Sequence, residues 1–179
     1  MTGDDKLIHR QHADLYQTST AVFSDCEKYR YSLVRTWDIS LNSITYLMLN
    51  PSTADEMVND PTIARCQRRA FEYGYGQMII SNLFPYRMTL SSQLDTVENL
   101  LGDSDVADRS IIEAVEQSSI TVCGWGSHHL SAARAKHVFK LLNERALSSK
   151  LHALQINQDG SPKHPLYVAY AKHPERFVI

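Results

Sequence analysis

The chain is poor in cysteine and has no long apolar run. Its three cysteines, Cys26, Cys66 and Cys123, are widely spaced, and no C-x-x-C pair is present. An odd number of isolated thiols argues against a disulfide framework and against a four-cysteine iron–sulfur cluster, and it is typical of the reducing cytosol. No apolar stretch approaches the roughly 18 residues that a membrane span requires, and the polar segment Met1–Gln11 does not resemble a signal peptide. We therefore expect a soluble cytoplasmic protein with no membrane partner.

The chain also lacks an excess of charge of either sign. Lys and Arg number 18, Asp and Glu number 20, and the net charge is −2. The molecule as a whole therefore does not attract nucleic acid, and a nucleic-acid-binding surface would need a local basic patch. The nearest approach to such a patch in the sequence is Arg65, Arg68, Arg69 and Arg87. With 179 residues, of which 43% are hydrophobic, the chain is long enough for one domain with a substantial core.

Several common catalytic motifs are missing. The chain has no G-x-S-x-G elbow, no P-loop and no G-x-G-x-x-G segment, which are the marks of serine hydrolases, P-loop nucleotide hydrolases and dinucleotide-binding enzymes. No pair of histidines shows H-E-x-x-H or a comparable spacing, so we predict no metal site and no cofactor. The histidines considered are His128, His129, His137, His152, His164 and His173.

Apolar runs and turn signals predict alternating strands and helices. We expect strands at 29–37, 43–49, 77–83, 120–123 and 151–156, and helices at 61–73, 106–117 and 130–147. Asp60 and Pro61 form a helix start signal, as the N-cap and the first helical residue. The 43–49 run is almost wholly apolar, which is typical of a strand covered on both faces, so we place it centrally. The 29–37 strand is expected to pair with it as an opening hairpin.

These elements predict an α/β fold arranged as a three-layer sandwich. Its central sheet is expected to have four mainly parallel strands, with the 29–37 strand added as an N-terminal antiparallel strand. The strand–helix–strand order predicts right-handed parallel crossovers. Residues 1–28 are expected to form an N-terminal polar extension, and residues 29–179 a single α/β domain.

Polar and aromatic side chains follow all four predicted parallel strands. In an open parallel sheet, ligands bind beyond the carboxyl ends of the strands, so we expect these segments to meet at one cleft. Each combines a polar or aromatic side chain with Gly or Pro, a composition that fixes a tight backbone. The segments are Asn50-Pro51-Ser52, Asn82 to Tyr86, Gly124-Trp125-Gly126 and Lys163 to Leu166.

Each of these residues also has a purely structural interpretation. Asn50, which precedes a proline, is compatible with a local turn, and Trp125 is compatible with core packing. Asn82 within a buried strand needs a partner, which a neighbouring loop would satisfy as well as a ligand. His164 is suited to donating a hydrogen bond to an anion, although surface histidines commonly have no such role. Asp60 is expected first of all to cap a helix.

Seven segments carry a resemblance to a known family. They are R-Y-x-L-x-R-x-W at 30–37, M-L-N-P-S-T-A-D at 48–55, D-P-T at 60–62, G-Y-G at 74–76, N-L-F-P-Y-R at 82–87, W-G at 125–126 and G-x-P-x-H-P-L-Y at 160–167. On these motifs the chain is identified as a member of a bacterial and phage family known as domain of unknown function 1643. This resemblance brings no established activity with it.

A second resemblance is to the uracil-DNA glycosylase superfamily. Asn50-Pro51 is similar to the motif after the first parallel strand in the mismatch-directed branch, and His164-Pro165 is similar to the superfamily's His-Pro-Ser-Pro loop. The resemblance implies a uracil-DNA glycosylase-like fold. It also implies that Asn50 would position the attacking water and that His164 would stabilise the departing base anion as the two catalytic residues.

The same resemblance implies contacts with a base. Asn82 would contact the base edge. Phe84 or Tyr86 is suited to stacking on a base, although aromatic residues beside proline are also common packing anchors. The chain lacks the second Ser-Pro of the usual loop and has no Asp-Pro-Tyr-His segment, which leaves the substrate base open. The expected substrate-binding residues are Pro51, Ser52, Asn82, Phe84, Tyr86, Arg87, Trp125 and Gly126.

Three functions stay open from the sequence. The leading hypothesis is a glycosylase-like hydrolase that acts on the N-glycosidic bond of a base in nucleic acid or a nucleotide, which would be its partner. The second is a non-catalytic module that binds a nucleotide or nucleic acid in the same cleft. The third is an unrelated hydrolase that uses a metal, or Cys123 as nucleophile with His164 as base.

Overall fold

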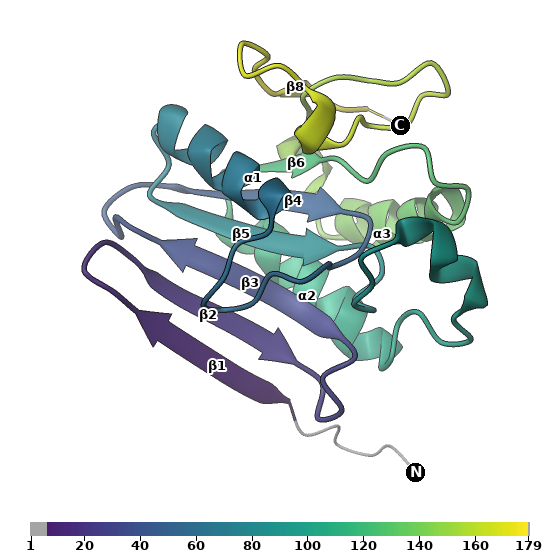
Figure 1. Ribbon diagram of the computed structural model, residues 1–179. Coiled ribbons are helices and arrows are strands. Elements are labelled where there is room, and N and C mark those ends of the chain that lie inside the picture. Colours follow the sequence, from purple (N-terminus) through teal and green to yellow (C-terminus); the bar gives the residue numbers. More distant parts are fainter. Residues whose placement is uncertain (1–6, 179) are drawn as a thin grey trace.

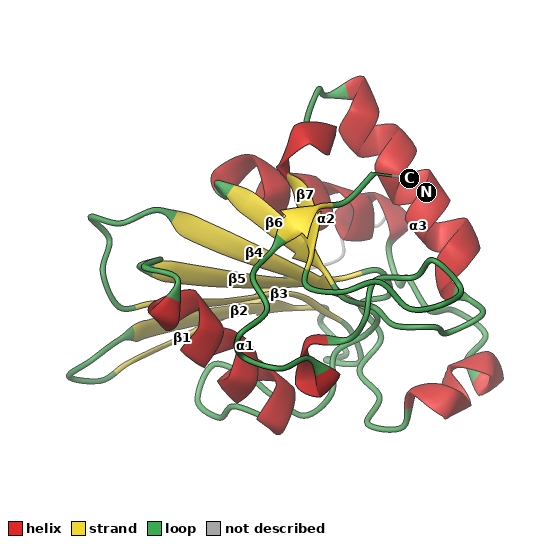
Figure 2. Cartoon of the chain, turned by 90° about the horizontal axis from the view of Figure 1, so that it is seen from above, coloured by secondary structure: helices red, strands yellow, loops and turns green. Residues whose placement is uncertain are grey.

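Helices cover both faces of a single mixed sheet in the computed structural model, which describes residues 7–178 (Figure 1). Helix α1 (Pro61–Glu72) lies on one face, and α2 (Ser104–Gln117) and α3 (Ser131–Glu144) lie on the other, as the view from above shows (Figure 2). The expected α/β architecture is thus confirmed. Residues 1–6 of the expected polar extension and the last residue, 179, lie outside the described part of the chain.

The sheet is larger and more mixed than we predicted. Its strand order is β1-β2-β3-β5-β4-β6-β7-β8. The strands β5, β4, β6 and β7 are parallel to their neighbours and form the four-stranded core expected from the sequence. Four strands pair antiparallel, where one was expected: β1, β2 and β3 at one edge and β8 at the other. The bounds are β1 (Ile8–Ala13), β2 (Thr18–Phe23), β3 (Arg30–Thr36), β4 (Ser43–Met48), β5 (Gln77–Asn82), β6 (Ile120–Cys123), β7 (Leu151–Ala153) and β8 (Glu175–Arg176).

Residues 8–23, expected as part of a polar extension, form the two strands β1 and β2. Strand β1 is the edge strand, and its residues alternate between half-buried and exposed. A strand of this kind needs few apolar residues, because one of its faces is solvated and its outer edge is unpaired. In β2 the alternate residues Ala21 and Phe23 reach the core, and this weak period-two pattern is the signal that the polar composition obscured.

The opening hairpin expected between the first two predicted strands is wrong. Strand β5 lies between β3 and β4, antiparallel to the first and parallel to the second. The connection after β3 spans this inserted strand: the N–H of Trp37 donates to the carbonyl of Gly76 at 2.9 Å, and the N–H of Gly76 donates to Asn42 at 2.9 Å. A short turn in the sequence indicates a reversal of the chain, but it does not reveal which strand fills the space between.

Strand β4 holds the central position that its apolar run predicted. It pairs with β5 on one side and with β6 on the other, and its residues after Ser43 are all buried. Ile44, Tyr46 and Met48 join the core cluster beneath α1, whereas Leu47 joins the cluster beneath α2 and α3. Successive side chains of a strand point to opposite faces, so a strand with a helix layer on each side is apolar throughout.

The helix start signal at Asp60-Pro61 is confirmed. Helix α1 begins at Pro61, and the Asp60 carboxylate accepts a hydrogen bond from the N–H of Ile63 at 2.9 Å. Helix α3 ends at Glu144 instead of residue 147, because the following Ala146 takes a positive φ of 57°. Among residues 7–178, no helix combines the length and apolar character that crossing a membrane would require.

Candidate functional site

A cleft of about 570 Å³ opens at the carboxyl ends of the parallel strands. It is formed by the segment after β4, the start of α1, the turn after β6 and the loop after β7. Four predicted segments were expected to meet here, and three of them do. The predicted residues that line the cleft are Asn50, Pro51, Ser52, Trp125, Gly126 and His164.

Asn50 is held in place through its amide nitrogen. Its Nδ2 donates to the carbonyl of Pro51 at 3.0 Å and to the carbonyl of Met88 at 2.8 Å. Both bonds use the nitrogen and leave the oxygen out, so Oδ1 is the atom that Asn50 offers to a ligand as an acceptor. The side chain is half-buried and is therefore both fixed and accessible from the cleft.

The loop that carries His164 is seated against the turn after β6. A Cβ on Gly124 would lie 2.7 Å from Cδ of Pro165, so only glycine allows this proline ring to pack against the strand end. The N–H of Gly126 donates to the carbonyl of Pro162 at 2.9 Å, and Nε of Arg65 on α1 donates to the carbonyl of Pro165 at 3.2 Å. The tight turn predicted around Trp125 thus positions His164 over the cleft.

The imidazole of His164 is oriented by a backbone bond. Its Nδ1 accepts from the N–H of Leu166 at 3.3 Å, so the proton of the neutral ring lies on Nε2. Burial lowers the pKa of His164, and the nearby carboxylate of Asp60 opposes this shift. The ring is therefore neutral near pH 7 and presents an N–H donor through Nε2.

The amino end of α1 contributes to the cleft wall. Asp60, Pro61, Thr62 and Ile63 line the cleft, although Asp60 was expected mainly as a cap. One of its carboxylate oxygens makes the cap, which leaves the second oxygen for other contacts. This carboxylate is itself the anionic group that the partial positive charge of the helix amino end favours.

Arg30 is a site residue that the sequence reasoning did not single out. Its side chain is 1% exposed and lines the cleft floor, where it donates to the carbonyl of Ala54 at 2.7 Å and to Oδ1 of Asn82 at 3.4 Å. Burial lowers the pKa of Arg30 to about 9, partly offset by Asp60. Within residues 7–178, Nε of Arg30 has no hydrogen-bond partner. The signal available in the sequence was an arginine at the start of a strand in which buried and less buried residues alternate.

The predicted segment that follows β5 does not line the cleft. Asn82 and Phe84 are buried, at 4% and 7% exposure, and Phe84 packs in the cluster beneath α2 and α3. Tyr86 forms a bridge with Tyr29, and the guanidinium of Arg87 lies 5.1 Å above the ring of Phe23. None of these four predicted substrate-binding residues, Asn82, Phe84, Tyr86 and Arg87, is among the residues that line the cleft.

Cys123, the alternative nucleophile, is a core residue. It is 0% exposed within the cluster beneath α2 and α3, and burial raises the pKa of its thiol well above the ordinary range. A thiol of this kind carries almost no thiolate at neutral pH. The geometry therefore gives no support to a hydrolase that depends on Cys123.

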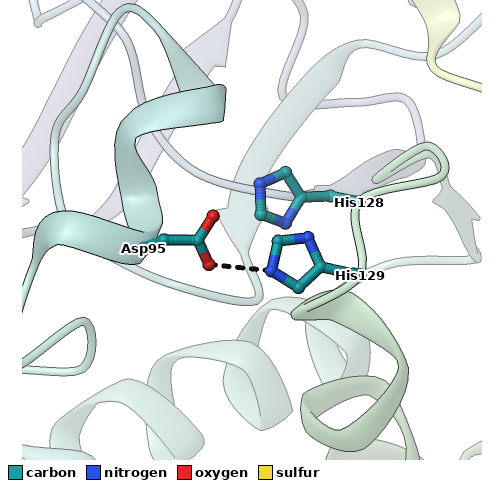
Figure 3. Close-up of side chains that lie close together, drawn as sticks. All are labelled: Asp95, His128 and His129. Carbon is teal, nitrogen blue, oxygen red and sulfur yellow. Dashed lines mark hydrogen bonds and ion pairs between the residues drawn. The ribbon is translucent and has the colours of Figure 1, made fainter.

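Three side chains of metal-ligating types gather at the rim of the cleft, although no histidine spacing predicted them. They are His128 and His129 from the loop before α3 and Asp95 from the short 3₁₀ helix η1 (Ser91–Thr96) (Figure 3). His128 and Ser91 also line the cleft, so this group adjoins it directly. The carboxylate comes from more than 30 residues upstream, which is why the spacing of the histidines alone did not indicate it.

Comparison with known proteins agrees with the first resemblance. The search of curated proteins found no match. The match to a family model covers residues 30–166, from the start of β3 to the loop that carries His164, and thus includes every strand-end segment described above. Because this match spans well over half of the chain, the protein belongs to the family described as protein of unknown function (DUF1643).

Proposed function

We propose that this protein hydrolyses the N-glycosidic bond of a base in nucleic acid or a nucleotide. The observation that carries the proposal is that Asn50 and His164 line the same cleft although they lie far apart in the sequence. The similarity of Asn50-Pro51 and His164-Pro165 to the two motifs of the uracil-DNA glycosylase superfamily supports the same chemistry. The cleft volume of about 570 Å³ falls within the range of small-molecule sites and suits a base with its sugar.

His164 is proposed to stabilise the leaving group. When the bond between C1′ and the base nitrogen breaks, the electron pair leaves with the base as an anion. A neutral imidazole with its proton on Nε2 donates a hydrogen bond to that anion, and its lowered pKa keeps it in this form near pH 7. A donor aimed at developing charge stabilises the transition state more than the ground state, which accelerates the reaction.

Asn50 and Asp60 are proposed to act on the attacking water. Oδ1 of Asn50 accepts a hydrogen bond from the water while Nδ2 is held by two backbone carbonyls. The water oxygen forms the new bond to C1′, and the second carboxylate oxygen of Asp60 accepts the released proton. That proton then passes to the base anion, so the products are the neutral base and the sugar with a hydroxyl at C1′.

The base and the sugar would occupy the cleft together with an adjoining phosphate. The buried guanidinium of Arg30 supplies positive potential beside the cleft and is fixed by its bond to the carbonyl of Ala54. A substrate with a phosphate next to the scissile nucleoside is therefore favoured over a free nucleoside.

Base release from a panel of substrates tests the proposal. The panel contains single- and double-stranded oligonucleotides with uracil, mismatched or modified bases, read by cleavage at abasic sites, and nucleotides, read by chromatography of the free base. We expect release that falls on the order of 10²–10³-fold in Asn50→Ala and in His164→Ala, the usual loss when one preorganised group is removed. Asp60→Asn keeps the helix cap and removes only the charge, so it isolates the role of the carboxylate.

Matched variants far from the cleft provide the control. Asn143→Ala and His173→Ala remove the same side-chain types from exposed positions and should release base at the parent rate. Parent rates in Asn50→Ala and His164→Ala, with both proteins folded, would contradict the assignment. So would the absence of release from every substrate in the panel.

A second candidate is a module that binds a nucleotide in the same cleft without chemistry. The buried guanidinium of Arg30 beside the cleft adds positive potential, which favours an anionic group in this place. Both candidates predict that a nucleotide raises the melting temperature in a saturable manner. Only the hydrolase also releases the base.

A further inference from the structure

We propose that Asp95, His128 and His129 bind a divalent transition-metal ion of the zinc class at the rim of the cleft. The inference goes beyond the proposed hydrolysis and does not depend on it. One candidate ligand atom from each side chain lies within 4.8 Å of the other two. Figure 3 shows the carboxylate of Asp95 reaching from η1 toward the two imidazoles, which stand side by side on the loop before α3.

The two histidines are arranged as a pair. Their rings are stacked with centroids 4.7 Å apart and an interplanar angle of 21°. Nε2 of His129 donates to Oδ1 of Asp95 at 2.8 Å. The imidazole and the carboxylate are thus already in contact, and a metal that replaces the shared proton would be bound by both groups.

Backbone contacts assign the metal-binding nitrogen of His128. A carbonyl only accepts, so the 3.1 Å contact between Nε2 and the carbonyl of Ser91 places the ring proton on Nε2. Nδ1 therefore carries the lone pair, which now accepts from the N–H of Leu130 at 3.3 Å and which a metal would take instead. A metal-bound histidine commonly donates its other N–H to a backbone carbonyl, and the Ser91 contact has this form.

The donor set selects the class of ion. Imidazole nitrogen with one carboxylate suits zinc and its neighbours in the first transition row, whereas calcium and magnesium prefer oxygen ligands. In a tetrahedral zinc site the ligand atoms lie about 3.3–3.5 Å apart. Asp95 and His129 are exposed, so small side-chain rotations from the present spacing close the site.

Because the proposed site lies at the rim of the cleft, an open coordination position on the metal would be accessible from the cleft. Three protein ligands leave at least one position for water or another ligand, as in catalytic zinc sites. His128 lines the cleft together with Ser91, whose carbonyl orients it. A ligand in the cleft would therefore be within reach of the metal, and a phosphate oxygen is a chemical group that suits such an ion.

Titration of untagged, chelator-treated protein with Zn²⁺ and Co²⁺ tests the proposal. We expect one ion per chain by calorimetry, and visible absorption of bound Co²⁺ with the pattern of nitrogen and oxygen ligation. Asp95→Ala, His128→Ala and His129→Ala should each weaken binding at least about tenfold, since removal of even the outer partners of metal ligands costs about 10- to 100-fold. His173→Ala, at an exposed position on another part of the surface, should bind as the parent does.

The readout is separate from base release. The absence of binding by folded parent protein would overturn the metal site and leave the proposed hydrolysis untouched. Binding that survives all three substitutions would overturn it equally, because the ion would then be held elsewhere. Thermal melts of each variant establish folding, and exposed positions such as Asp95 and His129 are expected to tolerate substitution.

Discussion

Two neighbouring parallel strands each lead into a segment with an asparagine, but only one of the two asparagines lines the cleft. Asn50, just beyond β4, lines the cleft with its Oδ1 available, whereas Asn82, at the end of β5, is 4% exposed and accepts from Arg30. The two strand ends run side by side as far as Phe84, whose N–H donates to Leu49 at 2.9 Å. Beyond this point the segment after β5 leaves the Asn50 segment and returns to it at Met88, whose N–H donates to Pro51 at 2.8 Å.

The turn after β5 is hydrogen-bonded to the start of the antiparallel strand β3 and to the residues just before it. The N–H of Arg30 at the start of β3 donates to the carbonyl of Pro85 at 2.9 Å, and the N–H of Arg87 donates to Lys28 at 2.9 Å. This neighbour covers the second segment and makes it a packing element. A polar residue at the end of a parallel strand thus becomes part of a site only where no further strand covers it.

The largest expected effect is on stability, from Phe84→Ala in the covered segment. Removing a buried phenylalanine leaves a cavity, and the free energy of unfolding should fall by about 3–5 kcal/mol in urea titrations. Phe71→Ala is the matched control, because Phe71 on α1 is 68% exposed and its loss should change stability by no more than about 0.5 kcal/mol. Equal effects of the two substitutions would show that Phe84 does not belong to the core.

A smaller effect is expected from Asn82→Ala. The substitution leaves Nη2 of Arg30 without its acceptor in a buried place, and the loss of such a partner costs about 1–3 kcal/mol. Chemical denaturation measures this loss. Asn50→Ala provides the comparison, since it should reduce base release far more than it reduces stability. If Asn82→Ala were the variant that lost activity with stability unchanged, the roles of the two asparagines would be reversed.

Arg87→Ala is expected to have a still smaller effect. The guanidinium packs over Phe23, a contact of the kind that contributes about 0.5–1 kcal/mol at partly exposed sites. Its removal should lower stability by this amount and leave nucleotide affinity and base release unchanged. A loss of affinity that depends on salt concentration would instead place Arg87 at a phosphate-binding surface.

The smallest expected effect is on the pH dependence of the free energy of unfolding, which reports on the burial of His164 in the cleft. Burial lowers the pKa of His164, so below its ordinary value of about 6.5 the unfolded chain binds more protons than the folded one. The free energy of unfolding should therefore decrease as pH falls from about 6.5 toward the folded-state pKa.

Urea unfolding of the parent and of His164→Gln between about pH 8 and about pH 5 measures this contribution. The variant lacks the histidine and should lose less stability than the parent across that range. A parallel fall of stability in both proteins would show that His164 does not titrate differently on folding.

Much of the local structure was predictable from the sequence. The four parallel strands, the helix that begins after the Asp60 cap and the tight turn around Trp125 follow from nearby residues, and all three are present. The strands β1 and β2 were missed because β1 is an edge strand with little apolar signal and the period-two pattern of β2 is weak. Three of the four strand-end segments reach one cleft, as expected from the rule that parallel strands end at the same edge of the sheet.

The sequence by itself determined which segments form strands and helices, because hydrophobic period, caps and glycine or proline turns act over a few residues. Only the tertiary structure decided that β5 lies between β3 and β4, that the 82–87 segment is covered, and that Asp95 meets His128 and His129. These outcomes depend on contacts between residues far apart in the chain, whose selection rests on the packing of the whole sheet. No local pattern in the sequence records that choice.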